Sequence, residues 1–180
     1  MNNRLITNNF LKVISIVLLI SLSWIIPVFS QDKPSEFESD IIKVAIVASD
    51  LKLTLDFYTN VIGMTNVREF DIDNPTSIRF GLSGGIPFHV SVLKLDNVPQ
   101  ATELKIMSFA KQPKHKKSKY IQDDIGVQYL TIYVNSITPF LKRIKSNNIK
   151  LLGQTPTTTG DKQYVLIQDP NGVFIELIEH

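Results

Sequence analysis

The apolar and polar residues of this chain form one pattern that occurs twice. Residues 43–49 and 129–135 are rich in β-branched and aromatic residues, which favour strands. Each run is followed by a residue that can cap a helix, Asp50 or Ser136. Apolar residues then recur at helical spacing. These two stripes are Leu51, Leu55, Tyr58 and Ile62, and Ile137, Phe140, Leu141 and Ile144. The pattern therefore predicts a strand followed by a helix in each copy.

Further short strands are expected after each helix. In the first copy they are predicted at 65–71, 77–82 and 87–95, and in the second at 149–153, 162–168 and 173–178. The repeated unit is then β-α-β-β-β, with modules at residues 41–96 and 126–179. About 150 residues after a leader are enough for one self-sufficient core, so one α+β domain over residues 41–179 is expected.

One acid lies in an otherwise apolar run near the end of the chain. Residues 169–172, Asp-Pro-Asn-Gly, are a strong turn signal, because proline fixes φ and Asn and Gly tolerate positive φ. The strand expected after this turn carries Glu176 among valine, phenylalanine, isoleucine and leucine. A carboxylate in such a strand is costly to desolvate unless it is paired, hydrogen-bonded or bound to metal. Glu176 is therefore the first candidate functional residue.

A resemblance to a known family rests on three segments, residues 44–51, 55–64 and 169–177. In that order and spacing they resemble the vicinal oxygen chelate superfamily, which holds glyoxalase I, extradiol dioxygenases, fosfomycin-resistance enzymes and bleomycin-resistance proteins. The resemblance covers residues 41–179 and implies a single domain whose two βαβββ modules form a cup-shaped mixed sheet. It does not choose a function, since the superfamily spans isomerases, oxygenases, transferases and drug-binding proteins.

The resemblance also implies where metal ligands would stand. In the metal-dependent members they lie on the first and last strands of each module and face into the cup. Histidine is usual at the positions that hold Lys43 and Tyr129 here, whereas the acid of the last strand is kept as Glu176. The fourth position depends on the alignment of the first module. Matching the glycines of the two turns places His89 opposite Glu176, and a slip of one residue would place Val90 there and turn His89 towards the helices.

These residues do not complete a metal centre. Lysine has no lone pair until it loses its proton, and tyrosine is a ligand only as phenolate. Glu176 and His89 alone would give Zn, Mn, Fe, Ni or Co two protein ligands, fewer than the three of an open catalytic zinc site. We therefore expect no metal cofactor. Lys43 is expected to pair with Glu176 in its place.

Three functions remain open from the sequence. The leading one is a metal-free cup that binds a small hydrophobic or anionic molecule through residues with convergent polar groups, namely Lys43, His89, Tyr129, Tyr133 and Glu176. The second is an enzyme, either a metal-dependent lyase, isomerase or dioxygenase with Glu176 and His89 as ligands, or a metal-free enzyme. In the metal-free case Glu176 or His89 would be the general base and Lys43 would stabilise an oxyanion. The third is an interaction module closed by a partner chain, and a homodimer is expected in every case.

The first 30 residues predict export. They carry Arg4 and Lys12, no acid, and an apolar run from Val13 to Ile26 that is short for a membrane span. A cleaved signal peptide with Gln31 as the new N-terminus is expected, followed by a polar linker over 31–40. The protein would then be periplasmic or secreted and off the membrane, or membrane-anchored if the segment is kept.

The charge balance excludes one class of partner. Of the 19 bases two lie in residues 1–30, and all 17 acids lie after them, so the exported chain has 17 bases against 17 acids. The net positive charge thus belongs to the leader, and binding to nucleic acid is not expected. The chain has no cysteine, which excludes both disulfides and a lipidated N-terminal cysteine.

Overall fold

The computed structural model describes residues 36–39, 41–112 and 117–179. Residues 41–180 form one compact unit, which groups apart from residues 1–40. The expected signal peptide, most of the linker and His180 lie outside the described residues. In the part of the chain that the structure describes, no helix has the length and apolar character needed to cross a bilayer.

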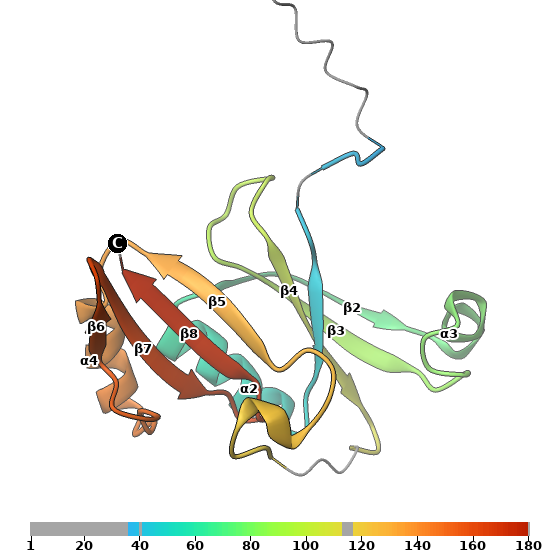
Figure 1. The fold of residues 1–180 in the computed structure, drawn as a ribbon. Coiled ribbons are helices and arrows are strands. Elements are labelled where there is room, and N and C mark those ends of the chain that lie inside the picture. The colour runs from blue at the N-terminus through green and yellow to red at the C-terminus, as the bar shows by residue number, and fades with distance from the viewer. Residues whose placement is uncertain (1–35, 40, 113–116, 180) are drawn as a thin grey trace, which may run out of the picture. The chain divides into compact units, whose positions relative to one another are not determined.

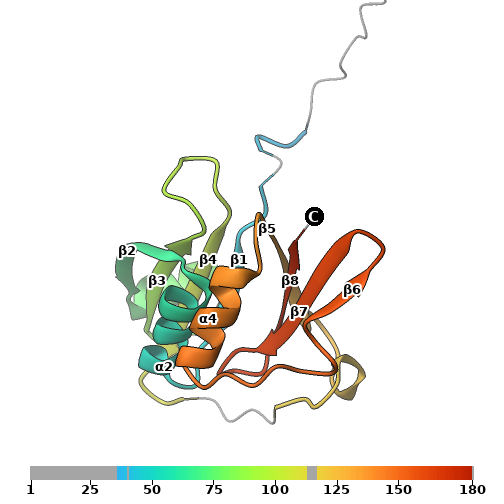
Figure 2. The same cartoon turned by 90° about the vertical axis from the view of Figure 1, so that its left-hand side faces the viewer.

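The first module builds a four-stranded sheet. Its elements in chain order are β1 (Val44–Val47), α2 (Leu51–Asp56), the π-helical η2 (Phe57–Ile62), β2 (Thr65–Ile72), α3 (Asn74–Phe80), β3 (Phe88–Lys94) and β4 (Glu103–Phe109). The strand order is β1-β4-β3-β2, with β1 parallel to β4 and the other neighbours antiparallel. Figure 1 labels β2, β3 and β4 of this sheet, and Figure 2 labels all four strands.

The second module repeats this plan. Its elements are η3 (Ile121–Asp123), β5 (Tyr129–Val134), α4 (Thr138–Ser146), β6 (Thr157–Thr159), β7 (Lys162–Gln168) and β8 (Phe174–Glu179). The order β5-β8-β7-β6 matches that of the first sheet, and β5 is parallel to β8. The predicted α+β fold of two βαβββ modules is therefore confirmed.

The first helix begins and ends where local chemistry requires. The Asp50 carboxylate accepts the N–H of Leu53 at 2.9 Å, which satisfies one unpaired donor of the first turn. The helix continues through η2 and ends at Gly63, whose φ of 91° lies in the left-handed region that glycine adopts without strain. The second helix begins after Ser136, whose hydroxyl accepts the N–H of Thr138 at 3.3 Å.

The strand predicted at 77–82 is wrong, because this segment belongs to helix α3. Asp73 accepts the N–H of Thr76 at 2.9 Å, a proline lies in the first turn, and Gly81 ends the helix with a φ of 71°. These are strong helix boundary signals. They outweigh the alternation of apolar and polar residues that favoured a strand.

The last strand of the first module lies further along the chain than predicted. The predicted strand at 87–95 exists as β3, but it is followed by β4, beyond the expected boundary at residue 96. In the second module the strand predicted at 149–153 is also wrong, since the third-to-last strand is the short β6. Each sheet therefore has its first and last strands side by side, as β1 with β4 and β5 with β8.

One core lies between the helices and the helix-facing sides of both sheets. It holds residues of both modules, including Tyr58 and Ile62 of η2, Ile106 of β4 and Leu177 of β8. Helix α4 packs against η2, and Figure 2 shows α2 and α4 next to each other. The Arg143 guanidinium of α4 also donates to the carbonyls of Val61 and Ile62, at 2.8 and 3.1 Å. The modules therefore share a core and are tied by hydrogen bonds across it.

The opposite face of the first sheet carries a smaller apolar cluster. Phe88, Val90 and Val92 of β3 are buried there and pack against Met107 and Phe109 of β4. Since side chains alternate along a strand, Lys105 lies on this second face as well, whereas His89 lies on the helix-facing side with Leu93. This alternation decides which predicted site residues face the same space.

Candidate functional site

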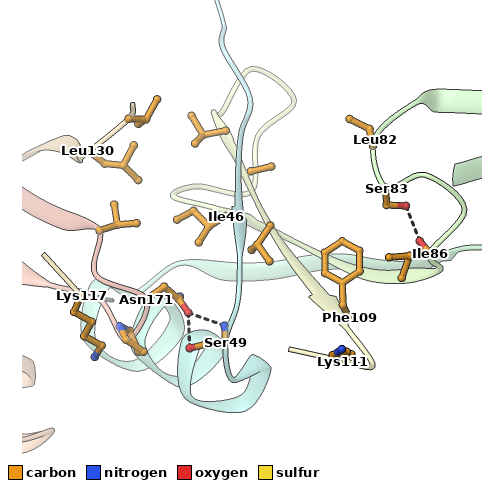
Figure 3. A pocket seen from close by; sticks show the side chains of 16 residues that line it. Ile46, Ser49, Leu82, Ser83, Ile86, Phe109, Lys111, Lys117, Leu130 and Asn171 are labelled. Carbon is orange, nitrogen blue, oxygen red and sulfur yellow. Dashed lines mark hydrogen bonds between the residues drawn. The ribbon is translucent and has the colours of Figure 1, made fainter. Parts of the chain in front are cut away.

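A cavity of about 770 Å³ lies along β1, at the seam between the two modules (Figure 3). The wall from the first module consists of β1, the loop after α3 and the end of β4, and the wall from the second consists of the start of β5 and the turn before β8. The lining residues are Val44, Ala45, Ile46, Val47, Ser49, Leu82, Ser83, Ile86, Phe109, Lys111, Lys117, Val127, Leu130, Pro170, Asn171 and Val173.

The cavity can form because β1 pairs on one side only. In the first sheet β1 is an edge strand next to β4, and in the second β5 is an edge strand next to β8. Successive residues 44–47 line the space, so both faces of β1 contribute to it. Most of the lining side chains are aliphatic, with Phe109 as the aromatic one. The site is therefore a mainly apolar pocket with a few polar groups, as small-molecule sites usually are.

Asn171 connects the two walls of the cavity. Its side-chain oxygen accepts the backbone N–H of Ser49 at 2.9 Å and the Ser49 hydroxyl at 3.1 Å. Its amide nitrogen donates to the Thr54 hydroxyl at 3.0 Å and to Asp169 at 3.2 Å. The turn of the second module thereby fixes the point where β1 of the first leads into α2.

The turn itself is organised around the buried carboxylate of Asp169, which is 2% exposed. One carboxylate oxygen accepts the N–H groups of Asn171 and Val173, both at 2.8 Å. The other accepts the hydroxyl of Tyr58 at 3.1 Å. Burial raises the pKa of Tyr58 well above its ordinary value, and the charge of Asp169 adds to the rise. Tyr58 is therefore a neutral donor that helps to satisfy the buried acid.

The strand register gives the position in the first module that matches Glu176. Val44 pairs with Leu104 in the first sheet, and Leu130 pairs with Ile175 in the second. With Val44 matched to Leu130, the next pairs are Ala45 with Lys105 and Thr131 with Glu176. Lys105, and not His89, is thus the counterpart of Glu176. The four ligand positions implied by the resemblance hold Lys43, Lys105, Tyr129 and Glu176.

Lys43 forms its ion pair with Glu103 and not with Glu176. The ammonium of Lys43 lies 3.2 Å from Glu103 of β4, and that of Lys94 lies 4.0 Å from the same carboxylate. Burial is the largest single influence and would raise the pKa of Glu103, but Lys43, Lys94 and Arg68 together outweigh it, so the pKa lies below its usual range. Glu176 instead accepts the hydroxyl of Thr131 at 2.8 Å. The expected pair between Lys43 and Glu176 is therefore wrong.

His89 does not face the cup. It lies on the helix-facing side of β3, as the alternative alignment anticipated, and Val90 takes the other face. Its Nδ1 lies 2.7 Å from the carboxylate of Asp71, and its Nε2 lies 3.4 Å from the hydroxyl of Ser91. Ser91 is fully buried. His89 is thus separated from Glu176, with which it was expected to form a site.

Tyr129 and Tyr133 lie on the exposed face of β5, where 52% and 65% of their surfaces are accessible. Thr131, the partner of Glu176, shares this face because side chains alternate along the strand. None of the five predicted ligand-binding residues lines the cavity, although Val44 and Leu130, which directly follow Lys43 and Tyr129, do. The cavity therefore begins beside the ligand positions and extends away from them.

The residues at the four positions do not fit a divalent metal. Lys43 and Lys105 offer ammonium groups, which repel a cation, and Glu176 is the single carboxylate among the four. Among the described residues, no group of three His, Asp or Glu side chains is arranged to hold a metal ion. These four residues therefore occupy the positions of metal ligands but lack the chemistry to bind a divalent metal.

Residues that reasoning from sequence did not select are Asn171, Lys111 and Lys117. Asn171 belonged to the turn signal, but its bonds to the first module depend on how the modules pack. The two lysines lie in the lysine-rich stretch 111–120 between the modules, where a solvated surface segment is the simplest interpretation of the sequence. Their place at the cavity follows from the end of β4 and from the turn before β8, and no local signal in the sequence indicates it.

The comparisons with known proteins agree with this architecture. The family model of the Glyoxalase/Bleomycin resistance protein/Dioxygenase superfamily matches residues 40–177. A glyoxalase family protein from Bacillus cereus has 15% identity and a TM-score of 0.66, over 81% of this chain and 96% of that one. A glyoxalase I mutant from Zea mays has 19% identity and a TM-score of 0.59, over 78% of this chain and 44% of that one. Glyoxalase I from Leishmania major has 17% identity and a TM-score of 0.55, over 75% of this chain and 82% of that one.

At these identities the solved structures support the fold alone. A comparison with curated proteins gives no match. The family model, however, covers more than half of the chain and spans both modules. The chain therefore belongs to the Glyoxalase/Bleomycin resistance protein/Dioxygenase superfamily.

Proposed function

We propose that this chain is an exported binding protein that holds a small organic molecule at the seam between its modules, without a metal centre. The observation that carries the proposal is the cavity along β1. Its volume of about 770 Å³ is within the range of small-molecule sites, which runs from about 300 to 1,000 Å³. Its lining is mainly apolar, and burial of an apolar ligand there would be favourable.

The chemistry of the ligand positions supports the metal-free part of the proposal. Two of the four are lysines, and Lys43 already neutralises Glu103. A cation at this place would have to approach both Lys43 and Lys105, with Glu176 as the single carboxylate among the four positions and with Glu103 already paired to Lys43. The energy of such an arrangement is unfavourable because like charges repel in a partly desolvated site. We therefore assign binding to the cavity and not to chelation.

A neutral apolar fluorophore tests the binding site. N-phenyl-1-naphthylamine becomes fluorescent in an apolar environment, and the exported form of the protein should bind it with one site per chain. Ala45 lies in the lining and is itself exposed, so Ala45→Trp would fill the cavity without disturbing the core. This variant should lose the probe, whereas Thr158→Trp on the exposed edge strand β6 should keep it. Binding that survives Ala45→Trp would contradict the proposed site.

Metal content tests the other part of the proposal. The exported form, purified without chelator, should take up less than one equivalent of Zn, Mn, Fe, Ni or Co when each is offered alone. Stoichiometric metal that is lost in Glu176→Ala would favour a metal-dependent lyase, isomerase or dioxygenase instead. Elemental analysis by mass spectrometry gives the readout.

A further inference from the structure

The cavity has a polar end, which is built by three chain segments. The parallel strands β1 and β4 end at the same edge of their sheet, so Ser49 and Lys111, which follow them, lie near this edge. Asn171 is bound to Ser49 and brings the turn before β8 to the same place. Figure 3 shows Lys111, Lys117, Ser49 and Asn171 towards one end of the cavity, and Leu82 and Leu130 towards the other.

The neutral polar groups at this end have already used their donors. The hydroxyl of Ser49 donates to Asn171. Both hydrogens of the Asn171 amide are used as well, one by Thr54 and one by Asp169. A ligand that reaches this end therefore meets no spare neutral donor from these two side chains. Among the described side chains at this end, the ammonium groups of the two lysines remain available as donors.

Neither lysine has an acidic partner in the described part of the chain. The ion pairs found there involve Lys43, Lys52, His89 and Lys94, and not Lys111 or Lys117. The described residues that line the cavity include no Asp and no Glu. The carboxylate of Asp169 lies behind the lining, and it is bound by Tyr58, Asn171 and Val173. The polar end is therefore cationic.

One of the lysines is anchored by packing. The Cα, Cγ and Cβ atoms of Lys117 lie 3.5, 3.6 and 3.7 Å from the point where a Cβ on Gly172 would lie. The first part of its side chain thus rests on the turn that also carries Asn171. Anchoring the aliphatic stem lowers the entropy that the ammonium group would lose on binding an anion.

We propose that the ligand is an organic anion with an apolar body, whose carboxylate or sulfonate lies at the end of the cavity that Lys111 and Lys117 line and whose body lies along β1. This inference rests on the proposed function, because it names the class of molecule that the same cavity holds. A neutral ligand would leave two cations without a counter-charge, and a cationic ligand would be repelled by them. The positive charge of the two lysines favours an anionic head group, and the aliphatic lining favours an apolar body.

Two probes that differ in one group test the inference. 1-Anilinonaphthalene-8-sulfonate carries a sulfonate that N-phenyl-1-naphthylamine lacks, and their apolar bodies are the same. In Lys111→Ala/Lys117→Ala the Kd of the sulfonate probe should rise at least about tenfold, which is about 1.4 kcal/mol, while the Kd of the neutral probe changes less than about twofold. Lys145→Ala/Lys150→Ala removes the same charge from an exposed region and should leave both constants unchanged.

The outcomes separate this inference from the proposed function. If both probes bind, are lost in Ala45→Trp, and respond equally to removal of the two lysines, the anion inference is wrong and the cavity assignment stands. The anion inference is also wrong if neither probe responds to their removal. If neither probe binds the wild-type protein, or if both still bind to Ala45→Trp, the proposed function fails and the inference fails with it. The inference would be supported if the Kd of the sulfonate probe also rises with salt concentration while the Kd of the neutral probe stays constant.

Discussion

The side chain of Asn171 accepts two hydrogen bonds from Ser49, which lies 122 residues earlier in the chain. The contact joins the last turn of the second module to the end of the first strand of the first module. The position of Asn171 in the Asp-Pro-Asn-Gly turn therefore has two roles. It closes a local turn, and it aligns the two halves of the domain beside the cavity.

Replacement of Asn171 by alanine should destabilise the domain. It leaves the N–H of Ser49 without an acceptor in a partly buried region, for a cost of about 1–3 kcal/mol. It also removes the donor to the Thr54 hydroxyl, which keeps its own bond to the carbonyl of Asp50. Urea unfolding followed by circular dichroism measures the loss. The control Asn97→Ala changes an exposed side chain and should cost less than about 0.5 kcal/mol. Equal stability of the two variants would mean that the link contributes nothing.

Tyr58 should make stability fall at alkaline pH. Its pKa is raised in the folded state, so its contribution is complete below the unfolded value near 10 and is lost as the pH rises towards the folded value. The free energy of unfolding should fall by up to about 1.4 kcal/mol per pH unit above pH 10 from this group. Tyr58→Phe should cost about 2 kcal/mol at neutral pH and should flatten the alkaline slope. If the alkaline fall in the free energy of unfolding is as steep in Tyr58→Phe as in the wild type, groups other than Tyr58 cause it.

A double-mutant cycle should couple Lys43 to Glu103 and not to Glu176. Lys43→Ala alone should cost no more than about 1 kcal/mol, because the lysine is half exposed and Lys94 also faces Glu103. The coupling with Glu103→Gln should vanish as the pH falls through the lowered pKa of Glu103, since a protonated carboxyl no longer attracts the ammonium. Urea midpoints measured in a series from pH 7 down to pH 2 provide the test. Measurable coupling between Lys43→Ala and Glu176→Gln would instead support the Lys43–Glu176 pair expected from the sequence.

The N-terminus of the exported protein should be at or near Gln31. The apolar run before it is short for a span and is followed by the small residue Ser30, as at a signal-peptidase site. Intact-mass analysis of the protein recovered outside the cytoplasm decides between cleavage and retention. Recovery of residues 1–30 on that protein would identify a membrane anchor.

The overall plan of the fold could be predicted from local signals that the chain repeats, whereas several element positions could not. The two strand-to-helix units, the cap at Asp50 and the stop at Gly63 depend on a few adjacent residues, so the βαβββ plan could be predicted and is confirmed. The errors lie where local signals conflict. At 77–82 alternation favoured a strand, but the cap at Asp73 and the stop at Gly81 specify α3.

The site was harder to predict because its geometry depends on register. Aligning Gly85 with Gly172 matched β3 to β8, although the counterpart of β8 is β4, which follows a longer loop. That choice selected His89 and overlooked Lys105. The pairing of Lys43 with Glu103 likewise depends on β1 lying next to β4, a contact between residues about 60 positions apart. The alternating residues of Glu103–Phe109 are the signal from which β4 could have been found.

The edge position of β1 and β5 has a consequence for how such a domain can change over generations. All strand pairs of each sheet lie within one module, and the edge strands β1 and β5 border the seam. Side chains therefore set the width of the seam between the two modules. Substitutions at Ala45, Val47 or Val127 would therefore widen, narrow or reshape the cavity without breaking a strand pair. A duplicated module with this arrangement can acquire new ligands by mutation at the seam while both of its sheets remain intact.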